Sequence, residues 1–251
     1  MEDIYALLAA LHRPCERQGP GSVESSRLAM RLAGLEQAKG LKIADIGCGT
    51  GASSLPLAED LAAEVTATDL LPAFLEELRQ RAQARGLADR IRTLACSMTE
   101  LPFADNEFDV LWAEGSVYNM GFENGVRAWR RFLKPEGMLV LSEITWLSDA
   151  VPAEIRAFWE KEYPEIATAS VKMAALERHG YSPVAYFALP ENCWRENYYY
   201  PLKARFAAFL AEQGHSDMAR ELVVMEEREM TLYEKFHQFY GYGMYIARKR
   251  A

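Results

Sequence analysis

Residues 43–51, Ile-Ala-Asp-Ile-Gly-Cys-Gly-Thr-Gly, and the later acid Asp69 have the types and spacing best suited to chemistry in this sequence. The apolar start of the segment predicts a buried strand, and Gly47, Gly49 and Gly51 let the backbone turn sharply against a bound ligand. A second strand-like run ends at Asp69, whose carboxylate could accept hydrogen bonds from both hydroxyls of a ribose. The pattern predicts a site for a cofactor that contains a nucleoside.

The kind of cofactor is less obvious from these residues. The stretch from Gly47 to Ala52 also fits the dinucleotide pattern G-x-G-x-x-G/A, with an acid at a suitable distance downstream. Asp45 argues against a dinucleotide, because we expect its carboxylate to point toward the loop, where it would repel a pyrophosphate and suit an ammonium group. Gly51 adds a position of close approach that the dinucleotide pattern does not require. A tight strand-to-helix turn without a ligand is the third alternative.

The composition limits the class of protein. The chain has 251 residues, enough for one substantial domain, and its net charge of −8 opposes nonspecific binding to nucleic acid. We find no apolar run long enough to span a bilayer, and the start, Met1-Glu2-Asp3, lacks the basic region of a signal peptide. The four cysteines, Cys15, Cys48, Cys96 and Cys193, are too scattered for a zinc site or a disulfide scaffold. We expect a cytoplasmic enzyme with reduced thiols and no metal.

Strand and helix patterns alternate from residue 41 onward, as a doubly wound α/β sheet requires. The predicted strands are 42–46, 64–69, 91–95, 108–113, 137–144, 182–189 and 240–247. The predicted helices are 2–11, 23–35 with Ser22 as its N-cap, 52–61, 73–85, 125–132, and largely helical stretches over 149–179 and 202–239. We expect one domain, 1–251, with an N-terminal helical lid (1–40), a core (41–145), and a cover with the last strands (146–251).

Further motifs support one interpretation of the cofactor site. D-x-G-x-G-x-G over 45–51 followed by Asp69 resembles motif I and the second acidic motif of class I S-adenosylmethionine-dependent methyltransferases. Three later stretches resemble the LPF, FDxV and LKPGG marks of small-molecule, UbiE-like members: Leu101-Pro102-Phe103, Phe108-Asp109-Val110 and Leu133-Lys134-Pro135-Glu136-Gly137. The resemblance covers about 41–145. It implies a mostly parallel, seven-stranded Rossmann-like sheet with a helical insertion near the C-terminus. It also implies that the protein binds S-adenosylmethionine as its cofactor and releases S-adenosylhomocysteine as the product.

The resemblance also assigns residues to parts of the cofactor. The acid and glycines of motif I, Asp45, Gly47, Gly49 and Gly51, would line the amino-acid part, and Asp69 would hold the ribose. Leu70 would pack against the adenine. Many relatives carry Asp-Ala at the adenine edge, where this sequence has Ser97 and Met98. The Ser97 hydroxyl would accept a hydrogen bond from the adenine, and the Met98 backbone amide would donate one to a ring nitrogen. The alternative is that Ser97 only caps a helix or turn. Gly19 would belong to a lid folded over the cofactor, or to a plain loop.

The acceptor side of the reaction has fewer signals. Methyl transfer from a sulfonium is an in-line displacement that needs no acid, and a base helps only when the nucleophile must lose a proton. The candidate catalytic residues follow the fourth strand and are Glu114, Tyr118 and Asn119. Glu114 could be a base, an anchor for a cationic group, or a carboxylate that only accepts hydrogen bonds from loop amides. Glu143, near the end of the fifth strand, is a weaker candidate. Tyr118 and Asn119 could orient the acceptor or simply close a turn.

Aromatic side chains are frequent in the C-terminal cover. They include Trp146, Phe158, Trp159, Tyr163, Trp194, Tyr198, Tyr199 and Tyr200. Such a lining suits a planar or apolar acceptor or a cation held over ring faces, but it equally fits packing of the insertion or a homodimer contact. Of the four histidines, we expect only His12 to approach the site, through the lid. The predicted function is methyl transfer to a small molecule, with a cofactor-binding protein without turnover, or an NAD-dependent oxidoreductase, as alternatives.

Overall fold

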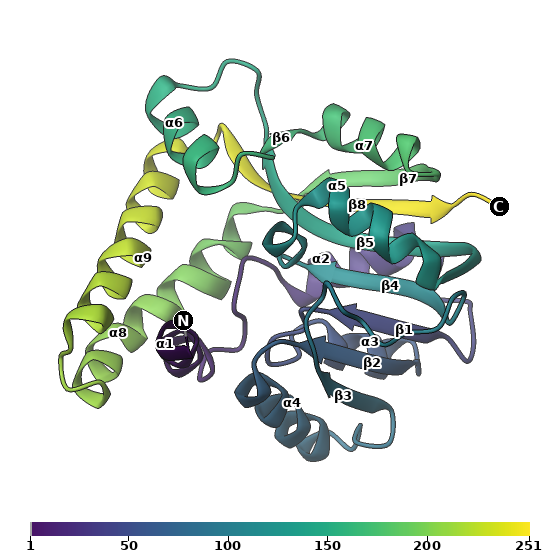
Figure 1. The fold of residues 1–251 in the computed structure, drawn as a ribbon, viewed down its shortest axis with the longest axis horizontal. Coiled ribbons are helices and arrows are strands. Elements are labelled where there is room, and N and C mark those ends of the chain that lie inside the picture. Colours follow the sequence, from purple (N-terminus) through teal and green to yellow (C-terminus); the bar gives the residue numbers. More distant parts are fainter. Residues whose placement is uncertain (1) are drawn as a thin grey trace.

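A mixed β-sheet forms the centre of the computed structural model, which describes residues 2–251 (Figure 1). Met1, where the predicted lid would begin, lies outside these residues. Seven strands lie in the order β3-β2-β1-β4-β5-β8-β7, and a two-residue strand, β6, pairs with β5. The strands are β1 (Lys42–Ile46), β2 (Glu64–Asp69), β3 (Ile91–Ala95), β4 (Phe108–Glu114), β5 (Leu133–Trp146), β6 (Ala167–Thr168), β7 (Tyr181–Ala188) and β8 (Tyr240–Lys249).

The strand directions create a single switch point in the sheet. The strands β1 to β5 pair in parallel, whereas β8 runs antiparallel to both β5 and β7. The chain moves from β1 outward to β3 and then returns to place β4 on the other side of β1. Ligands of such sheets lie beyond the carboxyl ends of the strands at this reversal. The predicted doubly wound, mostly parallel Rossmann-like sheet is confirmed, and β6 is an addition that the sequence did not predict.

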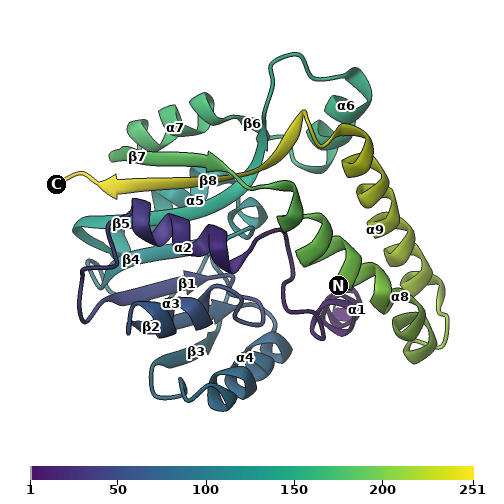
Figure 2. The same cartoon turned by 180° about the vertical axis from the view of Figure 1, so that it is seen from behind.

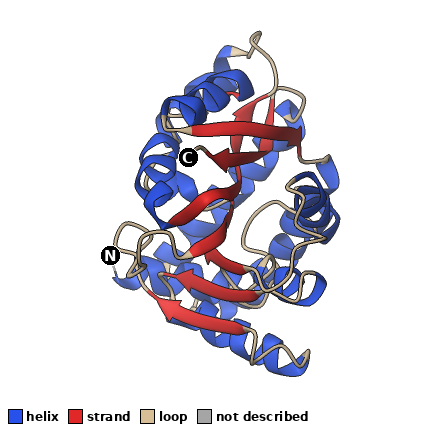
Figure 3. Cartoon of the chain, turned by 90° about the vertical axis from the view of Figure 1, so that its right-hand side faces the viewer, coloured by secondary structure: helices blue, strands red, loops and turns tan. Residues whose placement is uncertain are grey.

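Helices cover both faces of the sheet, as Figure 3 shows with the strands between two helical layers. The helices α2 and α3 lie on the face seen in Figure 2, and α5 and α7 lie on the face seen in Figure 1. The helices are α1 (Glu2–His12), α2 (Val23–Leu32), α3 (Ser54–Asp60), α4 (Pro72–Ala84), α5 (Phe122–Trp129), α6 (Ala153–Glu162), α7 (Ala169–Arg178), α8 (Tyr200–Glu212) and α9 (Asp217–Phe236). Parallel strands buried on two faces read as near-continuous apolar runs, which explains the composition of β1 and β4.

The C-terminal helices lie beyond the carboxyl ends of the strands together with the first helix. In both views, α1 lies beside α8, and α9 runs from α8 toward the start of β8 (Figures 1 and 2). Leu11 of α1, Phe209 of α8 and Tyr233 of α9 belong to the same buried apolar cluster, which continues into the sheet. The helices α1, α8 and α9 therefore form one packed layer above the switch point, whereas α2, β7 and β8, which the predicted lid and cover included, belong to the sheet and its face. In the part of the chain described, no helix is long and apolar enough to cross a bilayer.

Three element boundaries differ from the prediction for local reasons. Helix α2 ends at Leu32 because Gly34, with φ of 70°, allows a helix-ending turn in which the Leu35 amide donates to the Met30 carbonyl. The helical stretch expected over 149–179 is two helices, because Pro164 interrupts it and β6 lies between them. Strand β5 begins at Leu133, four residues earlier than predicted, across an irregularity in its pairing with β4. The N-cap role of Ser22 is confirmed, since its hydroxyl accepts from the Ser25 amide at 3.0 Å.

Candidate functional site

A cavity of about 430 Å³ lies at the carboxyl ends of β1, β2 and β4. Most of the predicted site residues line it: Gly19, Gly47, Gly49, Asp69, Leu70, Ser97, Met98, Glu114, Tyr118 and Asn119. Asp45 and Gly51 are not among the lining residues. We call this cavity the cleft. Its size is typical of a pocket for a small molecule or cofactor.

The glycine loop after β1 is held by the neighbouring strand. The amides of Gly47 and Cys48 both donate to the carbonyl of Thr68, at 2.8 and 2.9 Å. Gly47 and Gly49 have φ of 73° and 55°, which side-chain-bearing residues rarely adopt. A Cβ on Gly47 would lie 2.4 Å from Cβ of Ser116, so the loop must pass close to the segment after β4. Glycine is therefore required here both for the turn and for the close approach.

Gly51 has a different role from the one the sequence predicted. Its φ is 94°, and an added Cβ would lie 2.2 Å from Cδ1 of Leu78 in α4. The close approach at this position is to a packed leucine of the neighbouring helix. Direct contact between Gly51 and a cofactor stays a prediction without support from this geometry.

Asp45 lies behind the glycine loop and is fully buried. Its Oδ2 accepts from the hydroxyls of Ser53, at 2.7 Å, and Ser54, at 2.5 Å, at the start of α3. Burial raises the pKa of Asp45 to about 7, against the opposing effect of these two hydrogen bonds. Its Oδ1 has no hydrogen-bond partner among the described residues. The carboxylate thus supports the loop from behind, and Ser53, which lines the cleft, lies between it and the cavity.

Asp69 connects two backbone segments at the cleft. Its Oδ2 accepts from the Gly49 amide and its Oδ1 accepts from the Leu71 amide, both at 2.9 Å. Each carboxylate oxygen has a second lone pair that could accept from a ligand hydroxyl. Burial raises the pKa of Asp69, and the backbone hydrogen bonds oppose that shift. The next residue, Leu70, is 52% exposed and presents an apolar side chain to the cleft.

The segment 13–21 between α1 and α2, which we call the strap, closes one side of the cleft. Gln18 Oε1 accepts from the Thr50 amide at 2.9 Å, and Gln18 Nε2 donates to the carbonyls of His12 and Cys15. Arg81 of α4 donates to the Cys15 carbonyl and to the Thr50 hydroxyl. Gly19 lies in this strap and lines the cleft, as the lid interpretation expects.

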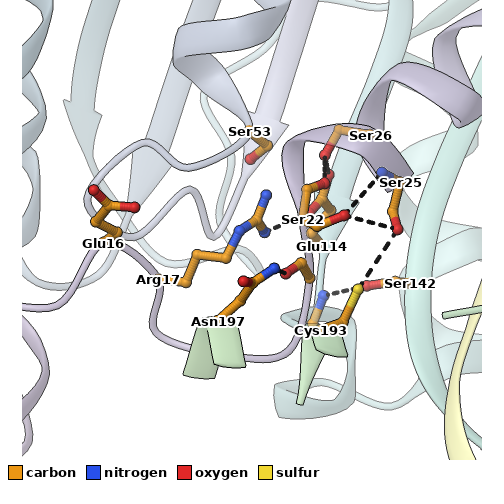
Figure 4. Close-up of polar contacts among 12 residues, drawn as sticks. Glu16, Arg17, Ser22, Ser25, Ser26, Ser53, Glu114, Ser142, Cys193 and Asn197 are labelled. Atoms are coloured by element: carbon orange, nitrogen blue, oxygen red, sulfur yellow. Dashed lines mark hydrogen bonds and ion pairs between the residues drawn. The ribbon is translucent and has the colours of Figure 1, made fainter. Parts of the chain in front are cut away.

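Glu114 is held by three donors, of which Arg17 and Ser26 are labelled in Figure 4. Its Oε2 accepts from Arg17 Nη1 at 3.0 Å, and its Oε1 accepts from the Ser26 hydroxyl at 2.5 Å. Oε1 also accepts from Trp112 Nε1 at 3.0 Å. A carboxylate paired with an arginine in this way is poorly suited to remove a proton. The predicted cationic partner is supplied by the chain's own strap.

The remaining candidates on the acceptor side differ in position. Asn119 Nδ2 donates to the Ser116 carbonyl at 3.0 Å, so Asn119 both closes a turn and lines the cleft. Tyr118 is 45% exposed where it lines the cleft. Glu143 lies outside the cleft, fully buried, with its Oε1 3.6 Å from Nζ of the buried Lys172. Burial raises the pKa of Glu143 to about 7, which the Lys172 charge opposes.

Sequence reasoning missed several residues of this region. Arg17 lines the cleft, and no motif marked it; Gln18, at the start of the segment 18–22 predicted as part of the lid, lines the cleft as well. His12 lines the cleft as expected, and it pairs with Glu226 of α9, which the sequence reasoning did not select. The apolar periodicity of 217–236 could have identified Glu226, since it falls on the same helical face as Leu222 and Val223. Within residues 2–251, no group of three or more potential ligands could hold a metal ion.

Comparisons with known proteins agree with this geometry. Residues 43–137 match the family model described as "Methyltransferase domain". The ubiquinone/menaquinone biosynthesis C-methyltransferase UbiE of Cereibacter sphaeroides is 36% identical over 110 residues, 43% of this chain and 44% of that protein. This segment is therefore similar to methyltransferase domains. The predicted family resemblance is thereby confirmed, although the chain spans about half the length of the curated relatives that it matches.

Solved structures match nearly the whole chain. A SAM-dependent methyltransferase from Geobacter sulfurreducens, in complex with S-adenosyl-L-homocysteine, has a TM-score of 0.83 at 19% identity, covering 99% of this chain and 98% of that one. The [4+2]-cyclase SpnF has a TM-score of 0.74 at 25% identity, covering 99% of this chain and 95% of that one. The methyltransferase fold therefore extends over the strap and the C-terminal helices.

Replacing Gly51 by alanine should destabilise the domain for two reasons. The positive φ at this position is unfavourable for alanine, and the added Cβ would collide with the Leu78 side chain. Gly34→Ala is the matched control, because Gly34 also has a positive φ but an added Cβ would meet nothing within 4 Å. We expect the control to lower the free energy of unfolding by about 1–2 kcal/mol. Gly51→Ala should lower it by about a further 1–3 kcal/mol, since the helix must shift. Denaturant unfolding measures both, and equal losses would contradict the packing role of Gly51.

The raised pKa of Asp45 predicts a pH-dependent stability. Between about pH 4 and pH 7 the folded protein keeps a proton on Asp45 that the unfolded chain releases, so the free energy of unfolding decreases as pH rises. Asp45→Asn removes this contribution, of about 1 kcal/mol per pH unit across the window. Urea unfolding from pH 4 to 8 measures the difference between the two proteins. Asp89→Asn, at an exposed position, is the control for the loss of one charge. A difference between the wild type and Asp45→Asn that does not change with pH would contradict the buried, protonated carboxylate.

Proposed function

We propose that this chain binds S-adenosylmethionine in the cleft and transfers its methyl group to a small-molecule acceptor. The observation that carries the proposal is Asp69, whose carboxylate lies at the end of β2 and is hydrogen-bonded to the glycine loop that follows β1. A nucleoside bound across these two strand ends would have its ribose hydroxyls next to the free lone pairs of Asp69. The relative from Geobacter sulfurreducens is described in complex with S-adenosyl-L-homocysteine, which supports the same ligand class.

The residues around the cleft fit the parts of this cofactor. Leu70 offers an exposed apolar surface on which an adenine ring would pack, and Ser97 and Met98, which line the cleft, would lie at the ring edge. The hydroxyl of Ser97 is engaged with the Thr99 amide, and the Met98 carbonyl accepts from Trp129 Nε1, so both positions are rigid. The carboxylate of Asp69 favours a ligand that carries positive charge, as a sulfonium and an ammonium do. Asp45, whose raised pKa keeps it protonated below about pH 7, supports the glycine loop from behind.

The bound cofactor would supply an activated methyl group on a sulfonium, and the protein would supply position and exclusion of water. Methyl displacement requires the acceptor atom in line with the methyl-sulfur bond, which a rigid cleft can impose. Arg17 holds the strap to Glu114 beside the cleft, and Gln18 fixes the strap to Thr50. We therefore assign Glu114 to closing the strap, with Tyr118 and Asn119 as the residues that contact the acceptor. Water excluded by the strap cannot compete with the acceptor.

Other parts of the proposal concern the acceptor and the setting. The net charge of −8 and the small cleft support a small molecule in preference to a nucleic acid. A homodimer stays a prediction, as does a cytoplasmic location. An NAD-dependent oxidoreductase is disfavoured by the methyltransferase domain that residues 43–137 match. Cofactor binding without methyl transfer is the relevant alternative, because the relative SpnF is named a [4+2]-cyclase.

Asp69→Ala should weaken cofactor binding by about 1–3 kcal/mol, because the ribose hydroxyls lose their acceptors. Isothermal calorimetry with S-adenosylhomocysteine measures the loss, and Asp89→Ala, at an exposed position, is the matched control. A thermal unfolding transition shows that each variant is folded. Unchanged affinity in folded Asp69→Ala would place the site elsewhere. NAD is the comparison ligand, and stabilisation of the wild type by NAD alone would overturn the proposal.

Turnover should appear as release of S-adenosylhomocysteine when the protein is incubated with S-adenosylmethionine and fractions of a metabolite extract. We expect release above the rate without extract in at least one fraction, because the acceptor completes the in-line geometry. Mass spectrometry measures the product and identifies the methylated compound. A protein that binds the cofactor but releases no product with any fraction would favour binding without methyl transfer.

A further inference from the structure

Two carboxylates occupy the inward face of α9, where apolar residues would be expected. Leu222, Val223, Met230 and Tyr233 are buried on this face, and Glu226 lies between them in the helical repeat. Glu229 follows one turn later, and burial raises its pKa to about 7. In contrast, the outward Val224 and Met225 are 62% and 65% exposed. An enclosed carboxylate is costly unless a partner neutralises it, so this reversed pattern calls for a ligand or a cation.

The chain provides only part of that compensation. Oε1 of Glu226 lies 3.4 Å from Nε2 of His12, whose Nδ1 has no partner in the described part of the chain. Oε1 of Glu229 accepts from the Tyr199 hydroxyl at 2.8 Å. Among residues 2–251, Glu229 has no cationic partner within ion-pair distance. His12 therefore contacts Glu226, whereas Glu229 has only a neutral hydroxyl donor.

Aromatic side chains surround this pair. Tyr198 stacks on His12, with ring centroids 6.3 Å apart, and burial together with the charges of Glu226 and Glu229 raises the pKa of Tyr198 well above its usual value. Tyr240 is fully buried, and its hydroxyl has no hydrogen-bond partner among the described residues. The charge of Glu229 is the main electrostatic contribution, after burial, to the raised pKa of Tyr240. An unpartnered hydroxyl thus lies in the field of the same carboxylate.

The carboxylate pair adjoins the cleft through His12, although neither carboxylate is among the residues that line it. His12 and Tyr118 both line the cleft, and His12 contacts Glu226. Tyr118 is 45% exposed in the cleft, but its hydroxyl lies deep enough that burial raises its pKa, and the charges of Glu229, Glu143 and Glu226 raise it further. His12 therefore connects the cleft with Glu226, and Tyr118 lies in the field of both carboxylates of α9.

We propose that the methyl acceptor carries a positively charged ammonium group, which binds between Glu226 and Glu229 against the rings of Tyr118 and Tyr198. This inference rests on the proposed function and names its substrate class. A carboxylate pair supplies the charge, and tyrosine faces favour a cation over an uncharged group of the same shape. The sequence left open a planar acceptor, an apolar acceptor and a cation over ring faces, and the enclosed acids favour the cation.

The probe pair for this inference is choline and 3,3-dimethyl-1-butanol, which differ only in the exchange of the quaternary nitrogen for carbon. Calorimetry first measures whether S-adenosylhomocysteine binds to the wild-type protein. The affinity of each probe is then measured by titration into the wild-type protein, with and without S-adenosylhomocysteine present. We expect choline to bind at least tenfold more tightly than the alcohol. Equal affinity, or no binding of choline in either form, would overturn the inference without any variant being needed.

Substitutions of the two carboxylates test whether choline binds at the proposed site. Glu229→Gln should reduce choline affinity at least tenfold and leave the alcohol unchanged, because only the charge of the anchor is removed. Glu227→Gln, an exposed position on the same helix, is the matched control and should change neither. Choline affinity unaffected by both Glu229→Gln and Glu226→Gln would contradict the assigned site. Heat with S-adenosylhomocysteine but none with choline rejects this inference alone, whereas no heat with S-adenosylhomocysteine rejects the proposed function.

Discussion

The hydrogen bonds from the Gly49 and Leu71 amides to the Asp69 carboxylate determine where the rest of the site can form. They join the loop after β1 to the start of α4, and the Thr68 carbonyl holds the same loop through two further amides. Backbone groups that lose water must find partners within the protein, so this arrangement is costly to disturb. The register of β1 against β2 therefore fixes the glycine loop, and the loop fixes the floor of the cleft.

Three enclosed carboxylates show different solutions to the cost of a buried charge. Asp45 accepts from two serine hydroxyls through one of its oxygens and supports the loop. Glu143 lies near Lys172 and joins β5 to α7, away from the cleft. Glu229 has only the Tyr199 hydroxyl and lies beside residues that line the cleft. Because a ligand can complete only a charge that it can reach, the third arrangement is the one that points to recognition.

The fold does not decide the reaction by itself. Similar folds belong to relatives named a C-methyltransferase and a [4+2]-cyclase, so the sheet and the glycine loop are compatible with more than one chemistry. The parts that differ most from a minimal sheet are the strap and the helices α1, α8 and α9, which together form the layer over the carboxyl ends of the strands. The Arg17–Glu114 pair belongs to the strap, and the carboxylates of α9 belong to that layer. We expect these parts, together with Tyr118 and Asn119 at the cleft, to set the acceptor specificity.

The sequence alone determined the strands, the glycine loop and Asp69, because these follow from apolar periodicity, backbone freedom at glycine and an acid at a strand end. It also placed Ser22 as an N-cap, a strictly local interaction. Only the tertiary structure decided that Gly51 faces Leu78, that Arg17 neutralises Glu114, and that α9 turns acids inward. These outcomes depend on contacts between elements distant in the chain, and local patterns contain no information about which partner a side chain will meet.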